Sequence, residues 1–436
     1  MHYLRRSIVH ADAGQFKYEI REIVAVAEAL QKLGVTMKSW ENIGDPIHKG
    51  EVVPQWIKDI VLDLARQDFS WGYTATQGTL NTREYLSGKV NERGGCQITA
   101  KDIIFFNGLG DAVARLFGSM KREARIIGPS PAYPTHSSAE AAHSGYAHLT
   151  YDLVPEKGWM PDLEVLENKI RYNDTIAGIL LINPGNPTGS VYSRELLEKI
   201  VDIARRYRIM VISDEIYANI VYNGAKTAHL SEVIGDVPGF ALKGVSKEYP
   251  WPGGRCGWIE VFNQDKDADF AEYIGSIINA KMLEVCSTSL PQHSIPRVME
   301  DPRYPVHMAT RRGIFEARVN EAVSVFETCS GIEVVRPQGA FYMPVLFKSG
   351  VLSEKQTLKI DNPAAKKFVE EKVQGMALDK RFSYYLLAAK GICVVPLTGF
   401  CCERYGFRVT ALECDDEKRL WTWRAIVEAI DEYLNS

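Results

Sequence analysis

The side chains most able to do chemistry stand where short apolar runs end. The segment 213–217, S-D-E-I-Y, closes the apolar run 210–212. A carboxylate at Asp214 would lie at the edge where open α/β sheets bind ligands, with Tyr217 one helical turn later on the same side. An aspartate in this position is also a common helix N-cap. The residue alone leaves both interpretations open.

A second segment, 183–189 with the sequence N-P-G-N-P-T-G, follows the apolar run 178–182. Two prolines restrict its backbone, and its glycines allow positive φ angles. A tight turn is the simplest interpretation, yet a turn needs neither two asparagines nor seven constrained residues. We infer that the segment aims the side-chain amide of Asn186 at a ligand.

A third group is Ser246-Lys247, followed by Arg255 in the glycine-rich bend 253–257. Most lysines are solvated surface residues. In a closed pocket, however, a lysine loses its proton readily and can attack a carbonyl to form a Schiff base.

The fourth group is the glycine turn 108–110 between the apolar run 103–106 and a helix. Its free N–H groups and the positive helix end suit a phosphate. The turn looks like the dinucleotide fingerprint G-x-G-x-x-G. We nevertheless reject NAD, because Val113 occupies the sixth position and no acid ends the next strand. A plain strand–helix connection remains the alternative.

Together the four groups call for one ligand that carries four features. These are an aldehyde for Lys247, a phosphate for the glycine turn and Arg255, a ring nitrogen for Asp214, and a phenolic oxygen for Asn186 and Tyr217. Pyridoxal 5′-phosphate has all four.

The chain resembles the class I/II aminotransferases, which are fold-type I pyridoxal-phosphate enzymes. The resemblance runs from Gly44 to Arg408 and rests on three motifs: N-P-G-N-P-T-G, S-D-E-I-Y, and S-K followed by G-G-R-C-G-W. It implies an α/β fold with a mostly parallel central sheet between helices, plus a smaller α+β domain. It also implies pyridoxal 5′-phosphate as cofactor.

The resemblance assigns roles to the residues around the cofactor ring. Lys247 would form the Schiff base and move the proton between the substrate Cα and the cofactor. Asp214 would keep the pyridinium nitrogen protonated. Asn186 and Tyr217 would hydrogen-bond the ring oxygen O3′, and Tyr133 would stack on the ring.

It also assigns roles at the phosphate and at the substrate. The phosphate would be held by Gly108, Leu109, Gly110, Ser246 and Arg255. Tyr73 would reach the phosphate from a neighbouring subunit. Arg408 would grip the substrate α-carboxylate, supported by the backbone of Gly44 and by Asn186. His136 would be a partner of Asp214, with a solvated histidine as the alternative.

Two positions depart from the family pattern: Gly244 stands where a serine is frequent, and Leu397 where a glycine is usual. No arginine can be assigned to a side-chain carboxylate, which argues against strict aspartate preference. N-P-G-N-P-T-G and the G-I-C-V-V-P of segment 391–396 resemble the alanine-aminotransferase branch most.

The pattern between about 100 and 265 alternates short apolar runs with helical stretches, which is typical of a mostly parallel sheet. We expect a large domain over 46–294 and a small domain formed by 1–45 and 295–436. Helices are expected over 17–33, from 295 through 326, around 364–374 and over 417–434. The other expected strands are 124–127, 241–244, 257–262, 332–336, 341–346 and 392–395. The polar segment 348–390 is either a surface insertion or a flap over the site.

The composition is that of a globular enzyme. The 436 residues are 46% hydrophobic and carry a formal charge of −4, which argues against binding nucleic acid or anionic lipid through a broad basic face. No apolar run is long enough to span a membrane, and the N-terminus lacks the apolar stretch of a signal peptide. Eight cysteines without C-x-x-C predict reduced thiols in the cytoplasm, and the histidines form no metal motif.

These observations predict a homodimeric aminotransferase that moves an amino group between an L-amino acid and a 2-oxo acid by a ping-pong mechanism. The nearest alternative is a lyase on the same fold, either a carbon–sulfur lyase or an enzyme like aminocyclopropane-carboxylate synthase. A ligand-sensing regulator is the third possibility, but only about 40 residues precede segment 42–44, too few for a DNA-binding domain.

Overall fold

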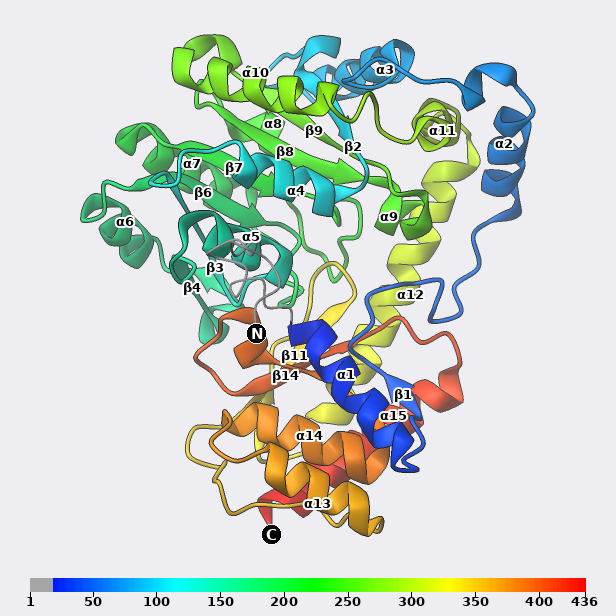
Figure 1. Cartoon of the computed structure of the whole chain (residues 1–436), viewed down its shortest axis with the longest axis vertical. Helices are drawn as coiled ribbons and strands as arrows, with labels where there is room; N and C mark the ends of the chain where they lie inside the picture. The colour runs from blue at the N-terminus through cyan, green and yellow to red at the C-terminus, as the bar shows by residue number, and fades with distance from the viewer. Residues whose placement is uncertain (1–18) are drawn as a thin grey trace, which may run out of the picture.

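The computed structural model describes residues 19–436, and its larger part is built on an eight-stranded sheet (Figure 1). The strands, in spatial order, are β2 (Ile103–Phe106), β9 (Gly257–Phe262), β8 (Gly239–Gly244), β7 (Met210–Asp214), β6 (Ile176–Ile182), β3 (Arg125–Ser130), β4 (Thr150–Val154) and β5 (Met160–Pro161). The neighbours β8, β7, β6, β3 and β4 run parallel to one another. β9 is antiparallel to both β2 and β8, and β5 is antiparallel to β4. The predicted α/β class with a mostly parallel sheet is confirmed.

Helices cover both faces of this sheet. Alternate residues of β2 enter different cores: Ile104 and Phe106 pack with one cluster, Ile103 and Phe105 with another. The first face is covered by α4 (Leu109–Gly118), α5 (Pro134–Ser144) and α10 (Ala268–Met282). The second is covered by α2 (Gln55–Ala65), α3 (Leu80–Glu92), α6 (Leu163–Arg171), α7 (Arg194–Tyr207), α8 (Leu230–Val233) and α11 (Ser289–Met299).

The smaller part contains two short sheets and its own apolar core. An antiparallel sheet holds β10 (Ile332–Val334), β11 (Tyr342–Phe347), β14 (Gly406–Thr410) and β13 (Val395–Pro396). A two-stranded sheet joins β1 (Ser39–Trp40) to β12 (Ile392–Cys393). The surrounding helices are α1 (Glu19–Lys32), α13 (Pro363–Lys372), α14 (Leu378–Lys390) and α15 (Asp416–Leu434). Chain from both ends therefore shares one core.

The helix α12 (Arg303–Phe326) runs from one part to the other (Figure 1). Near its start Met308 packs with Tyr217 and Tyr342, and at its end Phe326 lies in the core of the smaller part. The division into two domains stays a prediction. Ile295, which begins the predicted small-domain segment 295–436, lies in the core of the large sheet.

The expected long helix from 295 to 326 consists of two helices, α11 and α12. The break falls at 300–302, where Pro302 directly precedes α12. The expected strand 392–395 is likewise two strands, because β12 pairs with β1 whereas β13 pairs with β14. The expected helix 17–33 corresponds to α1, with residues 17 and 18 outside the described chain.

The segment 348–390 is neither a surface insertion nor a flap. Its helix α14 is buried along most of its length, and residues such as Phe382, Leu386 and Leu387 belong to the small core. No residue of this segment lines the cavity described below. Between Glu19 and Ser436, no helix is long and apolar enough to cross a membrane.

Candidate active site

A cavity of about 550 Å³ opens where the strands of the large sheet end, against β14 and the loop 42–45 of the smaller part. This size is within the usual range for small-molecule sites. The predicted site residues that line it are Gly44, Leu109, Gly110, Tyr133, Asn186, Asp214, Tyr217, Ser246, Lys247, Arg255 and Arg408. Gly108 borders it through Arg255, whereas Tyr73 lies elsewhere and is 86% exposed.

Lys247 lies in the short helix α9 (Val245–Glu248), directly after β8. Its Nζ donates a 2.6 Å hydrogen bond to the carbonyl oxygen of Gly44. Burial lowers the pKa of this amine to about 8; nearby Asp45 opposes the shift and Arg408 adds to it. The amine therefore becomes a neutral nucleophile close to physiological pH.

Asp214 ends β7, and its two carboxylate oxygens have different partners. Oδ1 accepts a hydrogen bond from the backbone N–H of Ile216 at 3.2 Å, as an N-cap would. Oδ2 lies 2.8 Å from Nε2 of His136, which comes from the first turns of α5. His136 is buried, so the solvated alternative for this residue is wrong. This N–H belongs to the turn 216–219, and the next helix, α8, begins only at Leu230, so the helix N-cap interpretation is wrong. The side chain lines the cavity.

Arg408 on β14 faces Asn186 across the cavity. Its Nη1 donates to Oδ1 of Asn186 at 3.1 Å, and its Nη2 donates to the carbonyl of Asn42 at 2.8 Å. The guanidinium lies over the ring of Tyr342, 4.4 Å from the centroid. Arg408 is 1% exposed, and its Nε has no hydrogen-bond partner within the described part of the chain. A buried donor without a partner is costly, and a bound carboxylate would satisfy it.

Tyr217 donates to or accepts from Tyr342, with 2.9 Å between the hydroxyl oxygens. Burial raises the pKa of Tyr217 well above its usual value, with Tyr342 adding to the shift, so the phenol keeps its proton. Sequence reasoning missed Tyr342 and Asn42. Tyr342 carries no local signal, because it reaches the site from β11, 125 residues away along the chain.

The start of α4 forms an anion site with Arg255. Gly108, the N-cap, has φ = 84°, and a Cβ there would lie 2.4 Å from Nη2 of Arg255. Only glycine lets the guanidinium approach this closely. Leu109 and Gly110 begin the helix, so their N–H groups have no intrahelical acceptor. This end of the cavity fits the phosphate of pyridoxal 5′-phosphate.

The segment 183–189 divides its two asparagines between structure and site. Asn183 holds the loop: its Nδ2 donates to Thr227 Oγ1 at 2.8 Å and its Oδ1 accepts from the N–H of Tyr192 at 2.9 Å. Asn186 faces the cavity instead. Gly189 (φ = 65°) accepts two backbone hydrogen bonds from segment 338–339, which joins this loop to the smaller part. The segment is therefore a constrained turn, and it also directs the side chain of Asn186 into the cavity.

The comparisons with known proteins agree with this geometry. The family model for aminotransferase class I and II matches residues 42–420. The chain is 51% identical over 433 residues to a Methanocaldococcus jannaschii protein named as an uncharacterized aminotransferase, covering 99% of this chain and 100% of that one. It is 29% identical to the glutamate-pyruvate aminotransferase of Escherichia coli, over 75% of this chain and 79% of the relative.

Two solved structures share the fold. An alanine aminotransferase from Pyrococcus furiosus has a TM-score of 0.82 at 24% identity and covers 96% of this chain and 99% of its own. An Escherichia coli aminotransferase has a TM-score of 0.84 at 24% identity, over 99% of each chain.

The fold and the cavity thus define an enzyme of the pyridoxal-phosphate type, with a partly buried lysine, an aspartate paired with a histidine and an arginine beside the start of a helix. The chain belongs to the class I and II aminotransferases. It is a pyridoxal-phosphate-dependent aminotransferase of fold type I, and its similarity includes enzymes of the alanine-aminotransferase branch. The comparisons support transamination and give no support to the lyase alternative.

Proposed function

We propose that the enzyme transfers the amino group of a small L-amino acid, with alanine as the donor, to a 2-oxo acid. The observation that carries this proposal is the arrangement of Lys247 and Arg408 in one cavity. The amine has a lowered pKa, and the guanidinium keeps an unsatisfied donor. One group can exchange a proton with a substrate Cα while the other holds the substrate carboxylate.

Pyridoxal phosphate, when bound, supplies an aldehyde and an electron-withdrawing ring that makes the Cα–H bond of an attached amino acid acidic. The phosphate would be held by the N–H groups of Leu109 and Gly110, together with Ser246 and Arg255. Tyr133 would cover the ring. Placing these donors in advance lowers the entropic cost of orienting the reactants.

Lys247 would have two roles. Its amine would hold the aldehyde of the cofactor, and Nζ, once substrate had replaced it, would take the proton from the substrate Cα and later return one. The carbonyl oxygen of Gly44, 2.6 Å from Nζ, would accept a hydrogen bond from the released amine. Because the amine loses its proton near pH 8, it can act as a base under physiological conditions.

Asp214 and Tyr217 would tune the ring. The carboxylate of Asp214 would hold a proton on the ring nitrogen, and His136 fixes that carboxylate through its 2.8 Å contact. The phenol of Tyr217 and the amide of Asn186 would donate to the ring oxygen. Each of these groups is buried, so its dipole or charge acts with little screening.

The donor is proposed from both the cavity and the relatives. Arg408, supported by Asn186 and Gly44, would bind the α-carboxylate. The other lining cations, Lys247 and Arg255, have roles of their own, and the described cavity wall holds no further arginine for a side-chain carboxylate. The names of the Escherichia coli and mycobacterial relatives mention pyruvate or alanine.

We also infer a homodimer that works in the cytoplasm. Phe69, Trp71, Tyr73 and Leu283 are exposed large apolar side chains, and Leu283 is 89% exposed. A second copy covering this surface would bury them and could bring its Tyr73 to the phosphate. All eight cysteines are free thiols, as expected for a reducing compartment.

A spectroscopic screen tests the proposal. The holoenzyme is mixed with each of the twenty amino acids in turn, without an oxo acid, and the visible absorbance of the cofactor is followed. Stoichiometric loss of the band, greatest with alanine, is the expected result. Continuous release of pyruvate and ammonia would instead indicate a lyase, and no spectral change with any amino acid would contradict the proposal.

A further inference from the structure

Arg311 is a buried cation that does not line the cavity yet contacts the main chain of Lys247. It projects from α12 and is 3% exposed. Its Nη1 donates to the carbonyl oxygen of Lys247 at 2.6 Å and to that of Glu248 at 3.2 Å. A guanidinium in this position fixes the backbone from which the Lys247 side chain projects.

The other half of the guanidinium is held by Glu51. Nε pairs with Oε1 of Glu51, and Nη2 donates to Oε2 at 3.0 Å. A two-pronged pair of this kind fixes the orientation of the guanidinium plane, which a lysine could not do. The ring of Phe315, 5.2 Å away, packs against the same guanidinium.

Glu51 belongs to the turn that also carries Gly44. The N–H of Glu51 donates to the carbonyl of Pro46 at 2.9 Å, and the N–H of Lys49 donates to that of Asp45 at 3.3 Å. This turn returns to the lysine, because Nζ of Lys247 donates to the carbonyl of Gly44. The contacts thus form a closed circuit from Lys247 O through Arg311 and Glu51 to Gly44 and back to Lys247 Nζ.

We propose that Arg311, oriented by Glu51, is a positioning residue that sets the distance between the Lys247 amine and the Gly44 carbonyl. The inference rests on the proposed function of Lys247, whose amine must move away from its position and return to it in every half-reaction. A displacement of about 1 Å in such a group can lower a rate about a hundredfold.

The charged groups that act most strongly on the amine are Asp45, which lies in the turn with Gly44, and Asp214, Arg255 and Arg408 on other elements. Arg311 is neutralised by Glu51, so it acts on Lys247 through position. Loosening the circuit should let water reach the amine and reduce the effect of burial on its proton affinity.

The test uses Glu51→Gln and Arg311→Lys in the full-length protein. Two measurements are made on each variant: kcat and KM of the holoenzyme for alanine, and the pH midpoint for cofactor uptake after the cofactor has been removed. We expect kcat to fall about ten- to a hundredfold in both variants, with KM within about twofold. The uptake midpoint should rise by about one pH unit in Arg311→Lys, which keeps the charge at this position. Arg297→Lys, which alters an exposed ion pair with Asp63, is the matched control and should change neither quantity.

An unchanged uptake midpoint in Arg311→Lys, with kcat as in the unmodified enzyme, would overturn the proposal. So would a rise in KM at constant kcat in either variant, which would place the pair in substrate binding. Should Arg311→Lys fail to fold, kcat and KM of Glu51→Gln decide. The uptake midpoint needs no substrate, so this result is distinct from a failure of the proposed reaction, which Lys247→Ala tests.

Discussion

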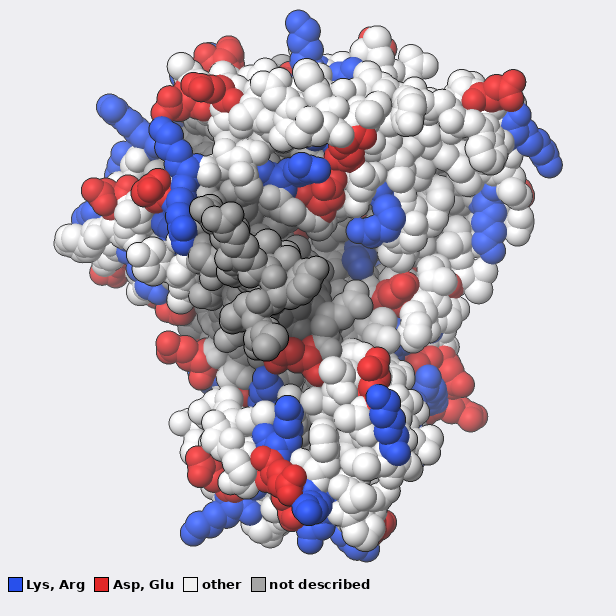
Figure 2. Space-filling view, in the orientation of Figure 1, with Lys and Arg blue, Asp and Glu red and all other residues white. Residues whose placement is uncertain are grey.

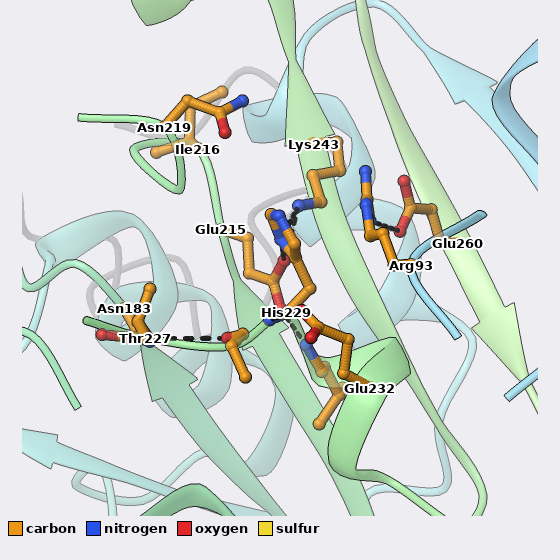
Figure 3. Close-up of polar contacts among 12 residues, drawn as sticks. Arg93, Asn183, Glu215, Ile216, Asn219, Thr227, His229, Glu232, Lys243 and Glu260 are labelled. Carbon is orange, nitrogen blue, oxygen red and sulfur yellow. Dashed lines mark hydrogen bonds and ion pairs between the residues drawn. The ribbon is translucent and has the colours of Figure 1, made fainter. Parts of the chain in front are cut away.

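Two lysines four residues apart, Lys243 and Lys247, have opposite surroundings: Lys243 is buried, whereas Lys247 is partly buried and lines the cavity. Lys243 projects from β8, where its Nζ pairs with Glu215 and lies 2.9 Å from Nδ1 of His229 (Figure 3). Among the described residues no carboxylate lies within hydrogen-bond distance of the Lys247 amine, which donates to the carbonyl of Gly44. The ion-pair partner separates Lys243, a structural lysine, from Lys247, the proposed reactive lysine.

The adjacent carboxylates Asp214 and Glu215 differ in the same way as the two lysines. Asp214 faces the cavity, whereas Glu215 points to the cluster with Lys243 and His229 (Figure 3). Burial opposes ionisation of Glu215, but Lys243 and His229 hold its pKa well below the usual value. The Leu230 N–H also donates to Glu215, at 2.7 Å. The ends of β7 and β8 are therefore tied together by charge beside the site.

Removing the reactive lysine should have the largest effect. In Lys247→Ala no amine can anchor the aldehyde or carry the Cα proton, so kcat should fall at least about a thousandfold. Borohydride should trap the cofactor on the unmodified protein and not on the variant, as mass spectrometry of the peptide would show. A variant that transaminated at the full rate would contradict the assignment.

Removing the structural lysine should cost stability instead. Lys243→Met leaves Glu215 buried and without its cation, so the free energy of unfolding should fall by about 3–5 kcal/mol. Urea denaturation of the holoenzyme measures this change. Lys169→Met is the matched control: it breaks an exposed pair with Asp152 and should cost about 1 kcal/mol or less. Equal effects of the two variants would remove the contrast between the lysines.

The pH dependence sharpens the comparison further. Lys247 must be neutral to react with the aldehyde, and its pKa is about 8 instead of 10.5. The rate of cofactor uptake by the cofactor-free protein should therefore rise with pH and level off above about pH 8. Stopped-flow absorbance between pH 6 and 10 measures this profile. A rate still rising steeply at pH 10 would mean that the amine is solvated.

The smallest effect is expected at His229. His229→Gln keeps the Lys243–Glu215 pair and removes one neighbour of the carboxylate, so the loss should be about 1 kcal/mol. Urea denaturation at pH 7 measures it, with Lys243→Met as the reference for a broken pair. A loss as large as that of Lys243→Met would show that the histidine is an essential member of the cluster.

The sequence allowed most of the sheet and the cavity to be predicted, because both follow from local patterns. β2 and β9 are apolar runs of strand length, and the chemistry-bearing residues Asp214 and Lys247 come directly after such runs. The cofactor followed from the four groups of residues taken together, whereas the enzyme class followed from the resemblance of the three motifs to class I/II aminotransferases. The residue roles stay predictions until the variants above are measured.

What escaped prediction depends on contacts between distant segments. Tyr342 and Arg311 join the site or its support only through packing of β11 and α12, which no local spacing encodes. The helix α14 was not predicted, for a different reason. Nearly all its faces are covered by α1, α13, α15 and the sheet, so its sequence lacks the one-sided apolar pattern of a surface helix.

The cavity wall is made by two cores: Asp214 and Lys247 come from the large sheet, whereas Gly44 and Arg408 come from the smaller part. The proposed proton-transfer groups and the proposed carboxylate ligand are thus mostly on separately packed parts of the chain. A library randomised at Val24 and Ile43, which line the cavity from the smaller part, could therefore change the amino acid accepted while Lys247, Gly44 and Arg408 are kept. The same division would let substitutions in the smaller part change substrate preference while the large sheet keeps its residues.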